Sequence, residues 1–303
     1  MNLLAPPLLC LGTAQLGLNY GITNKIGKLK ETDAKKIIMK AVSEGIKFFD
    51  TAQDYGRSEE LLGDTLSSFR DSKIINKFSY KSNKTWSTFD TKNWERNFQH
   101  SLLKLKATSI DSFLVHNCRD LNRKDSRFLI QWLDSLKERS LVRRIGVSIY
   151  NPKEIDFLPL EKLDIIQLPL SIFDQRFLDN GIINHLVSLN ISVHVRSIFL
   201  QGLILQKPEN LPNFLSPDFK LHHHMFYDSL KKSCQTPLEA SLDFIYRCKG
   251  IEAILFGVTN LSELISIIKT WNSVQYSNVE VLDHDDSFWA WNKTNETDPR
   301  TWP

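Results

Sequence analysis

Short apolar runs alternate along the chain with longer segments in which apolar residues recur every three or four positions. The short runs are typical of buried parallel strands, and the longer segments are typical of helices that pack on such strands. The predicted strands are residues 8–11, 46–51, 73–78, 110–116, 144–148, 164–170, 191–198 and 252–258. The predicted helices are residues 32–44, 58–66, 91–105, 127–141, 181–189, 237–248 and 261–271, with a short segment at 152–158.

The number of these repeats decides the fold class. Eight parallel strands can close into a barrel, whereas fewer would leave an open sheet. We therefore predict an α/β fold, a (β/α)8 or TIM barrel, in a single domain over residues 1–303, since no linker divides two cores. Thr32 is expected to cap the first helix.

Two stretches do not follow the repeat. Residues 201–236 contain four Pro or Gly residues and little periodicity, so we predict a long loop after the seventh strand, over the carboxyl face of the barrel. The tail, residues 281–303, is rich in Asp, Asn and Trp. We expect it to be too polar for a core element and to pack across the barrel.

Composition excludes several classes of protein. With 42% hydrophobic residues, 24% charged residues and only 12 Gly and 11 Pro, the chain is neither fibrous nor disordered. The 38 basic and 35 acidic residues leave a net charge of +3, without a basic block that could follow a phosphate backbone. No apolar run reaches the roughly 18 residues of a membrane span. We expect neither nucleic acid nor membrane binding.

The cysteines indicate the compartment. Cys10, Cys118, Cys234 and Cys248 lie far apart and without CxxC spacing, which favours reduced thiols. The apolar start of the chain has no basic segment and is interrupted by prolines, so no signal peptide is predicted. The expected location is the cytoplasm.

Polar residues at the predicted strand ends would meet on one face of a parallel barrel. Asp50, Lys77 and His116 end the second, third and fourth strands, and Tyr55 follows the second. The ammonium of Lys77 would lower the pKa of Tyr55 from its usual value near 10, and Asp50 would hold Lys77 charged. His116 could hydrogen-bond the oxygen that receives the proton. The four residues suit protonation of a carbonyl oxygen as a cofactor delivers hydride.

Each of these residues also has a purely structural interpretation. An Asp before Thr is a common turn or cap residue, a strand Lys can extend to solvent, and His116 could satisfy loop backbone. Their joint position at the ends of successive strands favours the functional interpretation.

Residues 50–59, Asp-Thr-Ala-Gln-Asp-Tyr-Gly-Arg-Ser-Glu, closely resemble the signature of the aldo/keto reductase family. Further resemblances follow in the family's order and span nearly the whole chain: Gly12-Thr13, Lys77, residues 111–116, residues 144–148 and Gln167. The resemblance implies a TIM barrel and NADP(H)-dependent reduction of aldehydes or ketones, or the reverse reaction. It also implies a catalytic tetrad, which maps onto Asp50, Tyr55, Lys77 and His116.

The resemblance further implies where the dinucleotide binds. Ser148 and Gln167 are expected to hydrogen-bond the nicotinamide carboxamide, with the backbone of Gly12 and Thr13 close by. Ile149 stands where the family usually has Asn, which leaves one carboxamide contact without its usual residue.

At the seventh predicted strand, where the family often has an aromatic residue that stacks on the nicotinamide, this chain has Arg196 followed by Ser197. Both are candidate cofactor-binding residues. The guanidinium of Arg196 can stack or bind an anionic group, and an ion pair at the barrel rim is the structural alternative.

Residues 256–260, Phe-Gly-Val-Thr-Asn, resemble the family's cofactor-phosphate loop, where a helix N-terminus meets the adenosine phosphate. Gly257, Thr259, Asn260 and Glu263 are therefore candidate cofactor-binding residues. Thr259 stands where a basic residue commonly binds the 2′-phosphate. Glu263 would disfavour that phosphate, but we favour a helix-capping role for it. The expected cofactor is NADP, with NAD as the alternative.

No metal site is predicted. The run His-His-His at 222–224 cannot point at one ion from regular structure, and no Cys or acidic partner has ligand spacing. Trp86, Phe89 and Trp94 are more typical of packing than of a sugar-stacking substrate wall, which stays the alternative.

The sequence therefore predicts an NAD(P)H-dependent oxidoreductase that reduces an aldehyde or ketone, with Tyr55 as general acid. A sugar-like small molecule is the expected substrate only because of the breadth of the family. One alternative is an epimerase-type redox enzyme that recycles its nicotinamide cofactor. Another is a regulatory barrel that binds the cofactor without catalysis. The protein is expected to be a monomer.

Overall fold

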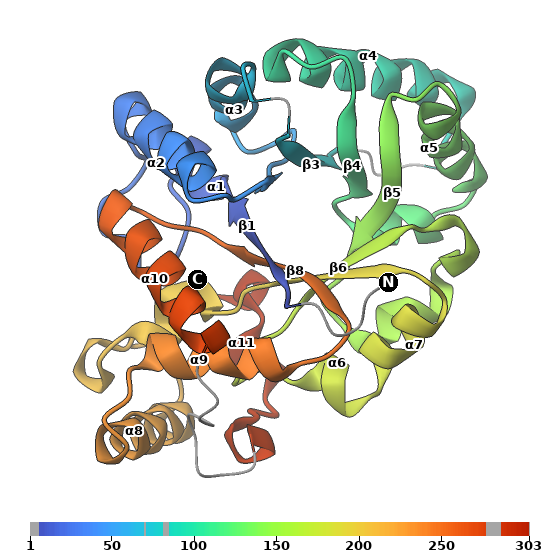
Figure 1. Ribbon diagram of the computed structural model, residues 1–303. Helices are drawn as coiled ribbons and strands as arrows, with labels where there is room; N and C mark the ends of the chain where they lie inside the picture. The colour runs from blue at the N-terminus through green and yellow to red at the C-terminus, as the bar shows by residue number, and fades with distance from the viewer. Residues whose placement is uncertain (1–5, 70, 81–84, 277–285, 303) are drawn as a thin grey trace.

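The computed structural model describes residues 6–69, 71–80, 85–276 and 286–302, and these residues form a closed barrel of eight parallel strands in chain order (Figure 1). The strands are β1 (Leu8–Gly12), β2 (Phe48–Asp50), β3 (Lys73–Phe78), β4 (Ile110–Val115), β5 (Val142–Ser148), β6 (Ile165–Pro169), β7 (Ser192–Arg196) and β8 (Ile251–Phe256). Strands β1 and β8 pair with each other and close the barrel. The predicted TIM barrel is confirmed.

Helices surround the strands (Figure 1). They are α1 (Ala14–Gly17), α2 (Glu31–Ser43), α3 (Ser58–Leu66), α4 (Thr88–Leu105), α5 (Arg127–Glu138), α6 (Arg176–Asp179), α7 (Ile182–Ser188), α8 (Pro217–Lys232), α9 (Pro237–Arg247), α10 (Leu261–Tyr276) and α11 (Thr294–Thr297). The 3-10 helices are η1 (Cys118–Asn122), η2 (Pro152–Phe157), η3 (Leu160–Lys162), η4 (Leu200–Leu205), η5 (Pro208–Asn210), η6 (Asp286–Trp289) and η7 (Pro299–Thr301). Of the helices within these residues, none combines the length and the apolar character that a membrane crossing requires.

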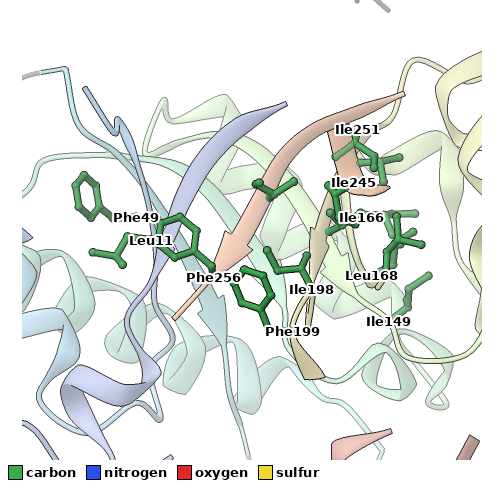
Figure 2. Packing of buried hydrophobic residues seen from close by; sticks show 14 of the residues in the cluster. Leu11, Phe49, Ile149, Ile166, Leu168, Ile198, Phe199, Ile245, Ile251 and Phe256 are labelled. Atoms are coloured by element: carbon green, nitrogen blue, oxygen red, sulfur yellow. The ribbon is translucent and has the colours of Figure 1, made fainter. Parts of the chain in front are cut away.

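Alternate residues of each strand enter two different cores. A small cluster fills the barrel interior: Cys10, Phe48, Ile75, Leu114, Ile165, Ala253 and Leu255. Their strand neighbours point outward and pack under the helices. Figure 2 shows Leu11, Phe49 and Phe256 in this outer layer, and the strand register places Leu11 beside both of the other residues.

The strand register brings the predicted site residues to one end of the barrel. Asp50 ends β2 and pairs with Ile75 of β3. Lys77 lies two residues beyond Ile75 on that strand. On the other side of the barrel, Ser148 ends β5 directly beside Gln167 of β6. Arg196 ends β7 beside Pro169. The carboxyl ends of the strands therefore meet at one face, as the sequence predicted.

The prediction of a long loop over residues 201–236 is wrong, because this stretch contains the helix α8. The side chain of Ser216 accepts a hydrogen bond from the backbone N–H of Phe219, and Pro217 occupies the first turn. Proline at that position favours a helix start rather than a break. Phe219, Phe226 and Leu230 recur at helical spacing and are buried.

The prediction that the tail is too polar for a core is also wrong for its described part, residues 286–302. The indole of Trp289 is buried against Phe226 of α8, with ring centroids 5.1 Å apart. The buried Glu296 accepts hydrogen bonds from the backbone N–H of Ser216 (2.8 Å) and from Trp291 Nε1 (2.9 Å). The Glu296 carboxylate is tolerated in this buried position because it has these partners. Residues 281–285 lie outside the described part of the chain.

Thr32 does not cap the first helix, which is a further correction. Helix α2 begins at Glu31, its N-cap residue is Lys30, and no side chain caps it. Glu31 and Asp33 in the first turn instead interact favourably with the helix dipole. The segment predicted at 152–158 is the 3-10 helix η2.

Candidate active site

Two adjoining cavities open at the carboxyl ends of the strands. The central cavity has a volume of about 410 Å³ and contains Tyr55 and Gln167 in its wall. The outer cavity, of about 770 Å³, includes Asp54. His116 and Tyr150 line both cavities, so they stand at the passage between them.

Most of the predicted site residues meet in the central cavity. Its wall includes Gly12, Thr13, Asp50, Tyr55, His116, Ser148, Gln167, Arg196, Ser197, Gly257, Thr259 and Glu263. Two predicted residues are not part of this wall. Lys77 is buried behind Asp50, and Asn260 lies at the start of α10.

A buried network connects Lys77, Asp50 and Gln167. Lys77 Nζ donates to Asp50 Oδ1 and, over 3.1 Å, to the carbonyl oxygen of Thr51. Gln167 Nε2 donates to the other carboxylate oxygen of Asp50 over 2.9 Å. Asp50, Lys77 and Gln167 are each at most 3% exposed, so the carboxylate is held from both sides in a medium of low dielectric.

Two glycines let the Tyr55 loop pack against α1. A Cβ on Gly17 would lie 1.9 Å from the carbonyl oxygen of Tyr55. Gly56 has a φ of +57°, and its Cβ would lie 2.6 Å from the carbonyl oxygen of Gly17. The close approach fixes the phenol over the strand ends. Its ring meets the His116 ring edge to face at 5.7 Å, and Lys77 Nζ lies 5.1 Å from the ring centroid.

The environment of Tyr55 differs from the predicted one in its effect on acidity. Burial raises the pKa of the Tyr55 phenol well above its usual value, and the negative charge of Asp50 raises it further. The expected lowering by Lys77 is therefore wrong for this structure. Lys77 is paired with Asp50, so the carboxylate neutralises most of the positive charge that would otherwise act on the phenol. The Tyr55 phenol is therefore held in its protonated form.

His116 has two partners that the sequence did not single out. Its Nδ1 lies 3.1 Å from Ser79 Oγ and 3.4 Å from Asp54 Oδ1. When the Ser79 hydroxyl donates to Nδ1, the imidazole carries its proton on Nε2. Asp54 is adjacent to Tyr55 in the sequence, and Ser79 lies two residues after Lys77. Those short spacings were the available signals for both residues.

The predicted carboxamide site has a polar atom without a partner. Gln167 Oε1 is buried and has no hydrogen-bond partner among the described residues, whereas its Nε2 is held by Asp50. Ser148 ends the neighbouring strand and is 1% exposed. Thr13 is already engaged, since its hydroxyl donates to the carbonyl oxygen of Asp50 over 2.8 Å.

Arg196 stacks on a tyrosine rather than forming the rim ion pair considered above. Its guanidinium carbon lies 3.7 Å from the ring centroid of Tyr150, and its Nη2 donates to the carbonyl oxygen of Ile149 over 2.8 Å. Nη1 donates to Ser197 Oγ over 3.3 Å. No carboxylate within the described residues approaches Arg196 to 4 Å. Ser197 has a φ of +60°, a conformation uncommon for residues other than glycine.

The capping role favoured for Glu263 is confirmed. Its carboxylate accepts hydrogen bonds from the backbone N–H and the hydroxyl of Thr259 and from Asn260 Nδ2, over 2.7 to 2.9 Å. In return, Asn260 Oδ1 accepts from the backbone N–H of Glu263 over 2.9 Å. Glu263 and Thr259 still line the central cavity, so this capped helix start faces the site.

The histidines at 222–224 face three different environments on α8. His222 Nε2 donates to the carbonyl oxygen of Trp289 over 3.1 Å, His223 is fully buried, and His224 lies 3.4 Å from Asp228. Across the described ranges, no group of three or more His, Cys, Asp or Glu could hold a metal ion. Trp86 and Trp94 are buried and pack at 5.1 Å, as predicted, while Phe89 is 71% exposed.

Part of the chain is similar to a known protein. An NAD(P)H-dependent D-xylose reductase of Candida tenuis is 31% identical over 91 residues. These residues are 29% of this chain and 28% of that protein, so the match spans less than a third of the relative's length.

Solved structures resemble the whole barrel. An aldo-keto reductase of Bacillus halodurans in its holo form has a TM-score of 0.69 and 19% identity, over 95% of this chain and 94% of that one. A glycerol dehydrogenase of Gluconobacter oxydans has a TM-score of 0.64 and 19% identity, over 88% and 90% of the two chains. At such identities the likeness concerns the fold alone.

The sequence profile of the aldo/keto reductase family matches residues 8–286. This range covers all eight strands and the wall of the central cavity, whereas Asp298, Arg300 and Thr301 of the outer cavity lie beyond it. The chain therefore belongs to the aldo/keto reductase family, whose members are NAD(P)-dependent oxidoreductases.

Proposed function

We propose that the protein reduces an aldehyde or ketone with a nicotinamide dinucleotide, and that Tyr55 is the general acid. The observation that carries this proposal is the network through Asp50. One carboxylate binds Lys77, which lies under the Tyr55 ring, and also binds Gln167, which faces the cavity. The proton donor and the expected carboxamide site therefore share one rigid support.

The residues present fit a dinucleotide. Gln167 Oε1 is a buried acceptor that needs a donor, and a carboxamide NH2 has the right chemistry. Ser148 would provide a second contact. The backbone at Gly12 approaches β8 so closely that a Cβ there would lie 3.3 Å from the carbonyl oxygen of Phe256. Ser197, Gly257 and Thr259 line the same cavity and would face the rest of the dinucleotide.

The residues of the chain then act on the carbonyl oxygen. When bound, the reduced dinucleotide supplies hydride to the carbonyl carbon. Tyr55 donates its phenolic proton to the oxygen, on which negative charge develops. His116 orients that oxygen through Nε2 while Ser79 holds Nδ1. Lys77 stabilises the phenolate that Tyr55 becomes, which is the moment at which its charge matters most.

The cofactor preference is proposed to be NADP with weak selectivity. Thr259 offers a hydroxyl where a cation would bind a 2′-phosphate, and that hydroxyl donates to Glu263. The carboxylate of Glu263 also places negative charge at the start of α10. Dual use of NADP and NAD follows.

We further propose that the enzyme works as a cytoplasmic monomer. The cysteines, which the structure shows as free thiols, support the location. The two adjoining cavities together offer room for a small carbonyl or alcohol substrate beside the dinucleotide.

The substitution Tyr55→Phe tests the proposal. It removes the proton donor and leaves the cavity shape intact, so we expect turnover to fall by about 10²-fold or more. Dinucleotide binding, measured by tryptophan fluorescence, should remain close to that of the native protein. Tyr276→Phe is the matched control, because Tyr276 is 87% exposed on α10. Native turnover in Tyr55→Phe would contradict the assignment of Tyr55.

The same assay separates the two alternative functions. An epimerase-type enzyme would convert its substrate without net oxidation of the reduced dinucleotide, and a regulatory barrel would bind the dinucleotide without converting any carbonyl. Net loss of nicotinamide absorbance with a panel of aldehydes and sugars supports the reductase.

A further inference from the structure

Tyr150 lies between two guanidinium groups. The guanidinium carbons of Arg196 and Arg300 are each 3.7 Å from the centroid of its ring. Two such groups cannot share one face of a ring at that distance, so they cover opposite faces. Arg196 ends β7, Arg300 belongs to η7 in the tail, and Tyr150 follows β5. Three distant parts of the chain therefore build this stack.

The stack stands between the place of reaction and the outer cavity. Arg196 lines the central cavity, Arg300 lines the outer cavity, and Tyr150 lines both. His116 also lines both cavities, and its ring contacts Tyr55. A substrate whose carbonyl reaches Tyr55 and whose other end extends into the outer cavity would pass along Tyr150.

The charges of the two arginines are not balanced equally. Arg300 is paired with Asp298, with Nη2 to Oδ2 at 2.6 Å. Arg196 has neutral acceptors only, the carbonyl oxygen of Ile149 and Ser197 Oγ, and its Nε has no partner among the described residues. A half-buried cation without a counter-charge costs free energy, and a bound anion would recover it.

A third guanidinium extends the positive wall. Arg119 lines the outer cavity and forms no ion pair with the residues that the structure describes. The acidic residues of the outer cavity are Asp54, Asp120 and Asp298. Asp54 faces His116 at 3.4 Å, Asp120 pairs with Arg123 at 2.8 Å, and Asp298 pairs with Arg300. Among the described residues that line the two cavities, the arginines without a carboxylate partner are therefore Arg196 in the central cavity and Arg119 in the outer cavity.

We propose that the carbonyl substrate carries an anionic oxygen group, a phosphate or a carboxylate, that binds at Arg196 beside Tyr150. A guanidinium presents paired donors that match either group. Arg119 adds positive potential along the outer cavity, and its 770 Å³ hold the remainder of a substrate larger than a simple aldehyde. This inference rests on the proposed reductase function.

Matched pairs of substrates test the proposal by kinetics. The pairs are glyceraldehyde 3-phosphate with glyceraldehyde, and succinic semialdehyde with butanal. The native enzyme should prefer the anionic member of at least one pair by about 10-fold or more in kcat/KM, through a lower KM. Arg196→Gln should reduce that preference about 10- to 100-fold, the loss expected for one charge-assisted hydrogen bond. Arg127→Gln, with an exposed side chain on α5, is the control and should leave the preference unchanged.

A binding measurement tests the proposal independently of turnover. Calorimetry should show that glycerol 3-phosphate or succinate binds the protein with its dinucleotide, that glycerol binds at least 10-fold more weakly, and that Arg196→Gln removes the difference. Comparison of glycerol 3-phosphate with succinate shows whether the site prefers a phosphate or a carboxylate. If no aldehyde is reduced by the native protein, the proposed function fails, and calorimetry still decides the anion site.

Two results would overturn the inference. The first is equal binding and turnover of charged and neutral partners in the native protein. The second is an Arg196→Gln protein, folded by circular dichroism, that binds the dinucleotide more weakly but keeps the preference for anionic substrates. In that case the anion facing Arg196 is the pyrophosphate of the dinucleotide. The same measurements are made on Arg119→Gln, because Arg119 is exposed and its substitution is not expected to affect folding.

Discussion

At the scale of single side chains, Asp50 joins two parts of the site. One oxygen of its carboxylate accepts from Lys77 and the other accepts from Gln167, 117 positions away in the sequence. The same carboxylate raises the pKa of Tyr55, after the larger effect of burial. Lys77 pairs with this carboxylate and offsets part of its effect, so the two residues influence the pKa of the phenol in opposite directions.

This opposition gives a prediction for the pH profile. Lys77→Met leaves the charge of Asp50 unbalanced, so the pKa of Tyr55 should rise and the alkaline limb of kcat/KM should move upward by about one unit or more. Asp50→Asn removes the charge that raises this pKa, so the limb should move downward. Lys73→Met, at the exposed start of the same strand, should leave the profile unchanged. Shifts of the same sign in both site variants would show that Asp50 acts on Tyr55 only through Lys77.

The dinucleotide preference is also decided by single residues at the start of α10. Thr259→Arg places a cation where the 2′-phosphate is expected, and one charge-assisted hydrogen bond should raise the preference for NADP about 10-fold or more. Titration of both dinucleotides against tryptophan fluorescence measures it. Ser262→Arg adds the same charge to the same helix turn outside the cavity wall and should change the preference much less. A native preference for NADP above about 10³-fold would mean that another cation binds the phosphate.

At the scale of elements, α8 and the tail stabilise each other. Glu296 of the tail accepts from the backbone N–H of Ser216, which begins α8, and His222 of α8 donates to the carbonyl oxygen of Trp289. Phe173 and Phe226 pack at 5.0 Å beneath them. The fully buried His223 lies in this layer, where a neutral imidazole fits the apolar surroundings better than a charged one.

His223 makes the stability of this layer depend on pH. Burial lowers the pKa of His223 to about 4, whereas the unfolded chain has a value near 6.5. Below pH 6.5 the unfolded state binds a proton that the folded state does not, so stability should fall between pH 6.5 and pH 4 by about 2 to 3 kcal/mol. His223→Leu should flatten this dependence in urea unfolding at pH 7 and pH 4.5. His224→Leu, at an exposed position of α8, is the control. An unchanged slope in His223→Leu would contradict the assignment.

At the scale of the whole molecule, a buried ion network lies at the end of the barrel where the strands begin. Arg144 of β5 binds Asp111 of β4 (2.8 Å) and Glu252 of β8 (2.7 Å), and His194 of β7 lies 3.1 Å from Glu252. The arginine side chain is 8% exposed. The network joins strands from both halves of the chain, opposite the end that carries the site.

Removal of one partner from this network should destabilise the entire barrel. Arg144→Met leaves Asp111 and Glu252 without their shared cation, and we expect a loss of about 3 kcal/mol or more in the free energy of unfolding. Urea unfolding followed by circular dichroism measures it. Arg143→Met, whose side chain is 58% exposed and also pairs with Asp111, should cost about 1 kcal/mol or less. Equal losses in the two variants would mean that burial does not decide the contribution.

The sequence by itself determined the barrel and the place of the catalytic candidates. Both depend on short-range patterns: apolar runs of strand length, helical periodicity between them, and the compact Asp-Thr-Ala to Ser-Glu segment at 50–59. Parallel strands bring their carboxyl ends together whatever the details of the loops. Asp50, Lys77 and His116 could therefore be placed together without knowledge of any contact between them.

Only the tertiary structure decided the residues whose roles depend on distant neighbours. Pro217 starts a helix because Ser216 and Glu296 satisfy its first turn, and the tail is buried because α8 provides its partners. The acidity of Tyr55 follows from burial and from the pairing of Lys77, which no spacing in the sequence encodes. The stack of Arg196, Tyr150 and Arg300 unites three segments that are far apart in the chain. Charge balance and burial are sums over the folded neighbourhood, and they exist only once the barrel has closed.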